Sequence, residues 1–174
     1  MAGRILVTYG TWTGSTAEVA EAVADEIRQG GAAVDVAPAA EVHDVAAYDT
    51  IVLGTPVRAS RLHRDVTAFV KRHAEGLSAA KVALFVSCLT MKEDTEENRQ
   101  KSLEFLEPIL KRLPRVSRDD VGLFAGAVFS DEERVRKLPL RERLVLKMLS
   151  SQKGDYRNWD AIRAWARKVS GGSS

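Results

Sequence analysis

The sequence predicts an α/β protein in which helices cover both faces of one doubly wound parallel β-sheet. Apolar, β-branched runs alternate with amphipathic runs along the chain, which is the order of strand–helix–strand units. Most of the apolar runs are continuous, as in strands whose two faces are both buried. A hydroxyl-rich loop between the first strand and the first helix adds a candidate anion site. No linker interrupts the alternation, so residues 1–170 form one predicted domain.

The individual elements follow from the periodicity of the apolar residues. We expect strands at residues 4–9, 33–37, 50–54, 81–86 and 121–129. We expect long helices at 16–29, 62–74, 95–113 and 158–169, and a short helical turn at 41–46. Pro108 should kink the helix at 95–113 or mark a restart, because proline has no N–H donor and crowds the preceding turn.

A basic insertion separates the last predicted strand from the last predicted helix. Residues 130–157 include seven Lys or Arg between Arg134 and Lys153, opposed there by Glu142 alone. The leucines among them predict a basic amphipathic helix at 140–150. Such a helix can contact an anionic membrane surface, here through residues 136–152, or it can pack on its own domain as a lid over a ligand. Both interpretations remain open.

Composition limits the function classes. A net charge of +2 without interleaved aromatic residues argues against nucleic-acid binding. Cys88 is the single cysteine and the histidines lack metal-site spacing, so we expect neither disulfides nor a metal. Residues 1–3 lead directly into a strand, and no apolar run approaches the ~20 residues of a membrane span. These features predict a cytoplasmic protein, either free or peripheral on the inner face of the membrane, with a disordered tail at 171–174.

The segment from Tyr9 to Thr16 carries most of the functional information. It follows a strand, opens a helix and contains four Ser or Thr hydroxyls but no Lys or Arg. The first N–H groups of the helix and the positive end of its dipole would face an anion in this loop. The loop lacks the lysine of a nucleoside triphosphate site, which argues against ATP chemistry. The alternative is a plain helix N-cap, although a cap requires only one hydroxyl.

This loop resembles the phosphate loop of flavodoxins, whose pattern Thr/Ser-x-Thr-Gly-x-Thr is met in full by residues 11–16. The resemblance implies FMN as cofactor and a five-stranded flavodoxin-like sheet of order 2-1-3-4-5. In this order the ligand lies at the carboxyl ends of strands one and three. The residues that the resemblance assigns to the cofactor follow strands one, three and four: Thr11, Trp12, Thr13, Gly14, Ser15 and Thr16; Thr55, Pro56, Val57 and Arg58; Ser87, Cys88, Leu89 and Thr90.

A narrower resemblance is carried by Val57-Arg58 with His63, by residues 69–74, and by residues 146–149 leading to Trp159. These segments are similar to menaquinone-dependent protoporphyrinogen IX dehydrogenases, which also carry an insertion before the last helix. The resemblance implies an FMN-dependent oxidoreductase of porphyrin and heme biosynthesis with a quinone as electron acceptor. Arg58 and His63 are then the candidate catalytic residues.

Three alternatives remain open at this point. The protein can instead be a flavodoxin-type electron-transfer protein that has no substrate of its own and serves redox protein partners. Arg58 can pair with a surface carboxylate rather than act at the flavin. Cys88 is more simply a small apolar filler than a redox thiol, because no second cysteine is present for disulfide exchange. We make no prediction of oligomeric state.

Overall fold

The computed structural model describes residues 3–129 and 132–171 of the chain. Within these residues the main sheet has five parallel strands in the order β2-β1-β3-β5-β6. Because β5 and β6 are the fourth and fifth of the long strands, the predicted order 2-1-3-4-5 is confirmed. The strands are β1 (Arg4–Tyr9), β2 (Ala33–Pro38), β3 (Thr50–Arg58), β5 (Lys81–Cys88) and β6 (Gly122–Ala125).

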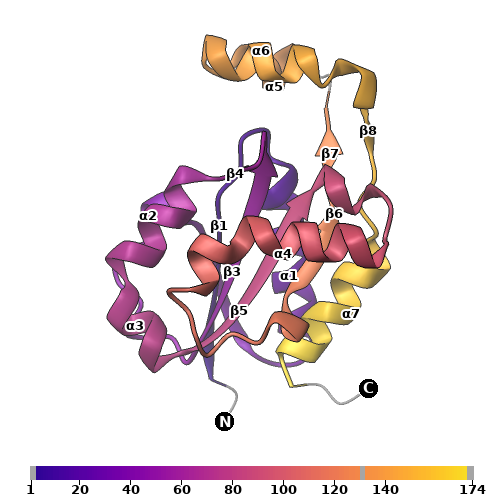
Figure 1. Ribbon diagram of the computed structural model, residues 1–174. Helices are drawn as coiled ribbons and strands as arrows, with labels where there is room; N and C mark the ends of the chain where they lie inside the picture. The colour runs from indigo at the N-terminus through magenta and orange to yellow at the C-terminus, as the bar shows by residue number, and fades with distance from the viewer. Residues whose placement is uncertain (1–2, 130–131, 172–174) are drawn as a thin grey trace.

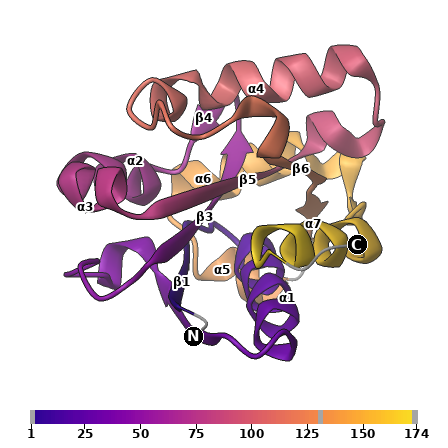
Figure 2. The ribbon, with the colours of Figure 1, turned by 90° about the horizontal axis from the view of Figure 1, so that it is seen from below.

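Helices cover both faces of the sheet (Figures 1 and 2). On one face lie α1 (Ser15–Gln29) and α7 (Trp159–Val169). On the other lie α2 (Arg64–Arg72), α3 (Ala74–Ala79) and α4 (Glu96–Leu110). Side chains along β3 alternate between the two cores, with Ile51 and Leu53 in one and Val52 in the other. Both faces are therefore apolar, which explains the continuous apolar runs in the sequence.

Several predicted boundaries are wrong, each for a local reason. The strand predicted at 121–129 divides at Gly126, since β7 (Ala127–Val128) leaves β5 and pairs antiparallel with β8 (Gly154–Asp155). The helix predicted at 62–74 begins later, because Arg61–Leu62 form β4 against the extended end of β3.

The remaining differences concern helix ends. The helix predicted at 62–74 is also shorter at its end, where α2 stops at Arg72 and α3 follows. The helix predicted at 95–113 contains Pro108 and ends two residues later, without the predicted restart as an α-helix. The turn predicted at 41–46 is a 3-10 helix at Ala39–Glu41.

The insertion lies beyond the carboxyl ends of the strands, at the top of Figure 1, and the two chain ends lie at the opposite side. It holds α5 (Glu132–Arg136) and α6 (Leu140–Met148), followed by a 3-10 helix at Ser150–Gln152. The predicted amphipathic helix is thus present over most of 140–150. Of the predicted tail, residues 172–174 lie outside the described residues. Among the residues described, no helix combines the length and apolar character needed to cross a membrane.

Candidate functional site

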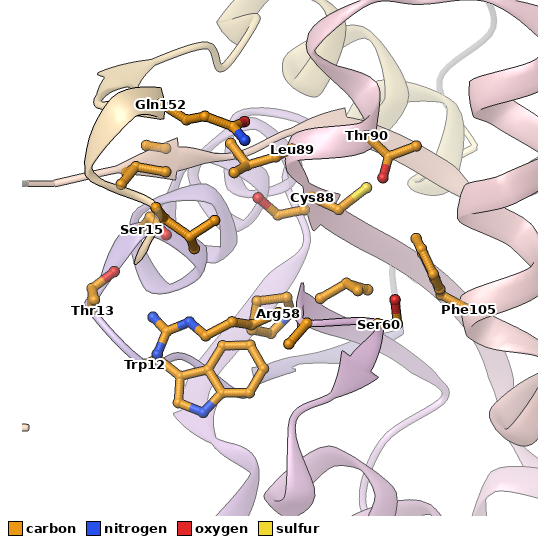
Figure 3. Close-up of a pocket in the computed structure, with 18 of the residues that line it drawn as sticks. Trp12, Thr13, Ser15, Arg58, Ser60, Cys88, Leu89, Thr90, Phe105 and Gln152 are labelled. Atoms are coloured by element: carbon orange, nitrogen blue, oxygen red, sulfur yellow. The ribbon is translucent and has the colours of Figure 1, made fainter. Parts of the chain in front are cut away.

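A cavity of about 420 Å³ lies at the carboxyl edge of the sheet, where the loops after β1, β3 and β5 meet (Figure 3). Most of the residues predicted from the sequence line it. They are Trp12, Thr13 and Ser15, then Pro56, Val57 and Arg58, then Ser87, Cys88, Leu89 and Thr90. Four predicted residues, Thr11, Gly14, Thr16 and Thr55, do not reach the wall of the cavity. The structure therefore brings the three predicted loops into one site.

The loop after β1 has a shape suited to an anion. Gly14 has a φ of 92°, in the left-handed region that favours glycine. Its N–H donates to Thr11 Oγ1 over 2.9 Å, so this hydroxyl braces the loop itself. No side chain caps the start of α1, which contradicts the plain N-cap interpretation. Thr16 Oγ1 is buried and has no hydrogen-bond partner among the residues described.

An unpaired buried hydroxyl is costly, so it normally has a partner. Here it lies beside the uncapped N-terminus of a helix, whose N–H groups and dipole favour negative charge. The donors of this loop therefore fit a phosphate that would pair with them.

Two arginines from distant parts of the chain approach the same loop. Arg157 Nη1 donates to the carbonyl of Ser15 over 3.1 Å, and Arg134 Nη1 lies 3.5 Å from the carbonyl of Thr13. Sequence analysis found no cation in the loop and missed both residues. They are separated from the loop by 121 or more positions, so no local motif could have identified them.

Trp12 lines the cavity and contacts two other side chains. The Arg58 guanidinium lies 4.6 Å from the centroid of its indole ring, and the His63 ring lies at 5.0 Å. Arg58 also forms an ion pair with Glu142 of α6, and the two side chains are only 10% and 20% exposed. Burial lowers the pKa of Arg58 and the Glu142 carboxylate opposes that effect. Arg58 thus lines the cavity and also pairs with a carboxylate.

His63 contacts Trp12 and is not among the residues that line the cavity. Its Nδ1 accepts from the N–H of Asp65 over 3.3 Å and so caps α2. It also packs against Gly10, where an added Cβ would lie 2.6 Å from the imidazole. The arrangement explains the glycine before the loop. Burial lowers the pKa of His63, although nearby Asp65 opposes this.

Three further lining residues were not selected by sequence analysis. Lys101 and Phe105, one turn apart on α4, line the cavity, as does Gln152 after α6. Figure 3 shows Phe105 and Gln152 on different sides of it. Among the lining residues the charged ones are Arg58 and Lys101, both cations. Cys88 Sγ lies 3.5 Å from Ser102 Oγ, and burial raises the pKa of the thiol. This environment agrees with Cys88 as a small filler.

The two sides of helix α6 differ in their exposure to solvent. Leu146 is buried and, with Leu149, lines the cavity, as expected of a lid. The opposite side exposes Leu140, Leu144 and Met148, which are 70%, 56% and 83% exposed. Their spacing of four residues places them on one face. The lid and membrane interpretations therefore concern opposite faces of the same helix.

The fold and the cavity define a doubly wound α/β protein with an anion-binding loop at the point where the strand order reverses. Residues 6–160 match the flavodoxin domain family, and the chain belongs to that family. Known structures of the same fold include a flavodoxin from the domain Archaea (TM-score 0.54, 14% identity, covering 95% of this chain and 98% of that one). Another is the two-electron reduced flavodoxin of Megasphaera elsdenii (TM-score 0.53, 19% identity, covering 92% and 98%).

Proteins similar to this chain include two kinds of dehydrogenase named for a quinone. The chain is 23% identical to protoporphyrinogen IX dehydrogenase (quinone) of Escherichia coli strain K12, over 95% of this chain and 94% of that protein. It is 36% identical over 89 residues to NAD(P)H dehydrogenase (quinone) of Cupriavidus metallidurans, a match that covers 38% of this chain and 45% of that protein. Similarity to oxidoreductases thus accompanies the flavodoxin fold.

The buried His63 predicts a stability change in mildly acidic solution. Its folded-state pKa is lowered, so the unfolded chain takes up the proton first as the pH falls below about 6.5. Stability contributed by the neutral imidazole is present above that pH and is lost as the pH falls through the folded-state pKa. Urea unfolding between about pH 7.5 and pH 5 measures the effect. We expect a flatter pH dependence in His63→Asn but not in His43→Asn, a change at an exposed histidine. Equal slopes in wild type and His63→Asn would contradict this.

Proposed function

We propose that this protein is an FMN-dependent oxidoreductase that uses a quinone as electron acceptor. The observation that carries the proposal is the buried, unpartnered Thr16 hydroxyl beside the uncapped start of α1. It lies next to a cavity lined by two further loops of the same sheet edge. Membership of the flavodoxin family and the quinone-linked relatives support the same assignment.

The residues present fit FMN in three groups. Thr13, Ser15 and Thr16, with the first N–H groups of α1, would hold the phosphate. Residues 55–58 and 87–90 would contact the ring, with Trp12 as a cover over the phosphate and ribityl chain. When bound, FMN supplies the hydride and electron transfer, while the protein supplies position and electrostatics.

The chain's own side chains set the surroundings of that ring. Leu146 and Leu149 of the lid and Phe105 of α4 add apolar surface to the cavity lining, which excludes water and suits a ring-shaped organic substrate. Lys101 and Arg58 add positive charge, and Glu142 partly offsets that of Arg58. We propose a substrate of the protoporphyrinogen type, as in the Escherichia coli relative, and hence a role in heme biosynthesis.

The outer face of α6 supports a peripheral membrane contact within this proposal. Leu140, Leu144 and Met148 form its apolar part. Arg143 and Lys147 lie on the same helix and add positive charge. An anionic bilayer of the inner membrane face is complementary to both features. A cytoplasmic protein docked in this way would present the cavity close to a lipid-soluble quinone.

The first prediction tests the phosphate site. Thr16→Val removes a hydroxyl that lacks a partner, so the apoprotein should be as stable as wild type or more stable. FMN affinity should fall by about tenfold or more, because a hydrogen bond to a charged group contributes ~1.5–3 kcal/mol. Riboflavin, which has no phosphate, should bind as before. Isothermal titration with both flavins measures the effect.

Thr8→Val is the matched control. Thr8 Oγ1 is the second buried hydroxyl without a partner in the described residues, but Thr8 lies within strand β1, whereas Thr16 lies in the first turn of α1. This change should leave the affinities for both flavins unaltered. Equal loss of FMN and riboflavin affinity in Thr16→Val would refute the assignment of the loop to the phosphate.

The second prediction separates an enzyme from an electron carrier. Because positive charge faces the cavity without a lining carboxylate, an anaerobic titration of the FMN-loaded protein should show one two-electron transition. Lys101→Gln should lower the midpoint by on the order of 10 mV, whereas Lys71→Gln on α2 should not. The reduced protein should then transfer electrons rapidly to menadione. Two well-separated one-electron steps and slow menadione reduction would favour a flavodoxin-type carrier.

The third prediction concerns the membrane contact. Replacing Leu140, Leu144 and Met148 by Gln should weaken co-sedimentation with vesicles of phosphatidylglycerol and phosphatidylcholine by about tenfold or more, because each apolar side chain contributes ~1.5–3 kcal/mol when fully buried. Binding by the wild type should also weaken with added salt. Ala79→Gln on the distant α3 is the control and should bind as wild type does. Vesicle binding unchanged by the triple substitution would exclude this face of α6.

A further inference from the structure

The insertion contacts the phosphate loop as well as the cavity, and these contacts assign it a role in cofactor binding. We infer that Arg134 and Arg157 are positioning residues that hold the phosphate loop in its anion-binding form. The inference rests on the proposed FMN site. It adds that binding of the phosphate and placement of the insertion depend on each other.

Arg157 is the more tightly held of the two. Its side chain is 4% exposed. It forms two hydrogen bonds with the Asp155 carboxylate, in which Nε donates to Oδ1 over 2.8 Å and Nη2 to Oδ2 over 2.6 Å. The guanidinium also lies 4.6 Å from the ring centroid of Trp159. The remaining guanidinium nitrogen, Nη1, donates to the Ser15 carbonyl of the loop over 3.1 Å.

Arg134 approaches from α5 on the other side of Glu18. Its Nη2 donates to Glu18 Oε1 over 3.2 Å, while Arg157 Nη1 donates to Glu18 Oε2 over 2.6 Å. Both guanidinium groups lie over the ring of Phe129, at 4.5 Å and 5.3 Å from its centroid. Glu18 belongs to the first turn of α1. One carboxylate thus joins both arginines to the start of the helix that faces the cofactor.

The direction of these contacts explains their effect. The carbonyl and the following N–H of one planar trans peptide point in opposite directions. Arg157 binds the carbonyl of Ser15, so the N–H of Thr16 points away from Arg157. Arg134 has the same relation to the Thr13 carbonyl, whose following N–H, that of Gly14, donates to Thr11 Oγ1 within the loop. The arginines therefore constrain the backbone by its acceptors, and the N–H of Thr16 is left to the site.

Glu18 offers a test in which two explanations predict opposite results. If the charges near the loop act only through long-range attraction, Glu18→Gln removes a negative charge and FMN should bind more tightly. If Glu18 anchors the arginines, FMN should bind about threefold or more weakly, with riboflavin unchanged, because the neutral amide replaces one of the two acceptor oxygens by an NH2 donor that would face a guanidinium group. Tighter FMN binding by Glu18→Gln would overturn the inference.

Arg157→Lys provides the second variant, because lysine keeps the charge but cannot reproduce the planar fork that binds Asp155 and the loop together. We expect its FMN affinity to fall by about tenfold, against little change for riboflavin. Arg167→Met is the control, since Arg167 pairs with Glu26 at the other end of α1 over 2.6 Å. Retained FMN affinity in Arg157→Lys, or equal losses of FMN and riboflavin, would contradict positioning. Failure of wild type to bind FMN would instead refute the proposed function.

The dependence must also hold in the reverse direction, because coupling between two sites is reciprocal. FMN should slow tryptic cleavage within residues 132–153 of the wild-type protein, whereas riboflavin at equal occupancy should not. In Arg157→Lys at saturating FMN this protection should be lost. Equal protection of the wild type by both flavins would show that the ring rather than the phosphate holds the insertion, and would overturn the inference.

Discussion

Strand β1 lies between β2 and β3, with all three parallel, and the geometry of the site depends on this pairing. Helix α1 leaves β1 over one face of the sheet, and α2 follows β3 over the other. The loops before these helices therefore separate at the carboxyl edge and leave a crevice between them. The uncapped start of α1 opens into this crevice, so the position of the anion site follows from the strand order.

The insertion is joined to this edge by charge pairs. Arg58 at the end of β3 meets Glu142 of α6, and Glu18 of α1 meets Arg134 and Arg157. A partly buried ion pair contributes little net stability, because desolvation offsets the attraction, but breaking it is costly. Such pairs select one placement among several. The acidic first turn of α1 and the basic insertion are therefore best understood as complementary parts of one site, and α6 can close the cavity while its outer face stays apolar and exposed.

Much of the fold followed from local patterns. Continuous apolar runs predicted the five long strands, and the hydroxyl-rich loop predicted the edge of the sheet at which the site lies. Predictions failed where a tertiary partner changed a local preference. Residues 61–62 were predicted as the start of a helix, but in the structure they pair antiparallel with β3. Residues 127–128 were predicted to continue the fifth strand, but in the structure they pair antiparallel with β8. Propensity is a weak guide at such positions.

The sequence by itself determined the class of fold and the anion loop at residues 11–16, because both depend on the spacing of residues close together in the chain. The strand order and the other two loops of the site followed from the family resemblance that this loop carries. Only the tertiary structure brought Arg157 to the loop after β1, Lys101 and Phe105 to the lining of the cavity, and Glu142 to Arg58. It also separated the inner and outer faces of α6. These contacts join residues that are tens to more than a hundred positions apart, where hydrophobic periodicity carries no information about which side chains will meet.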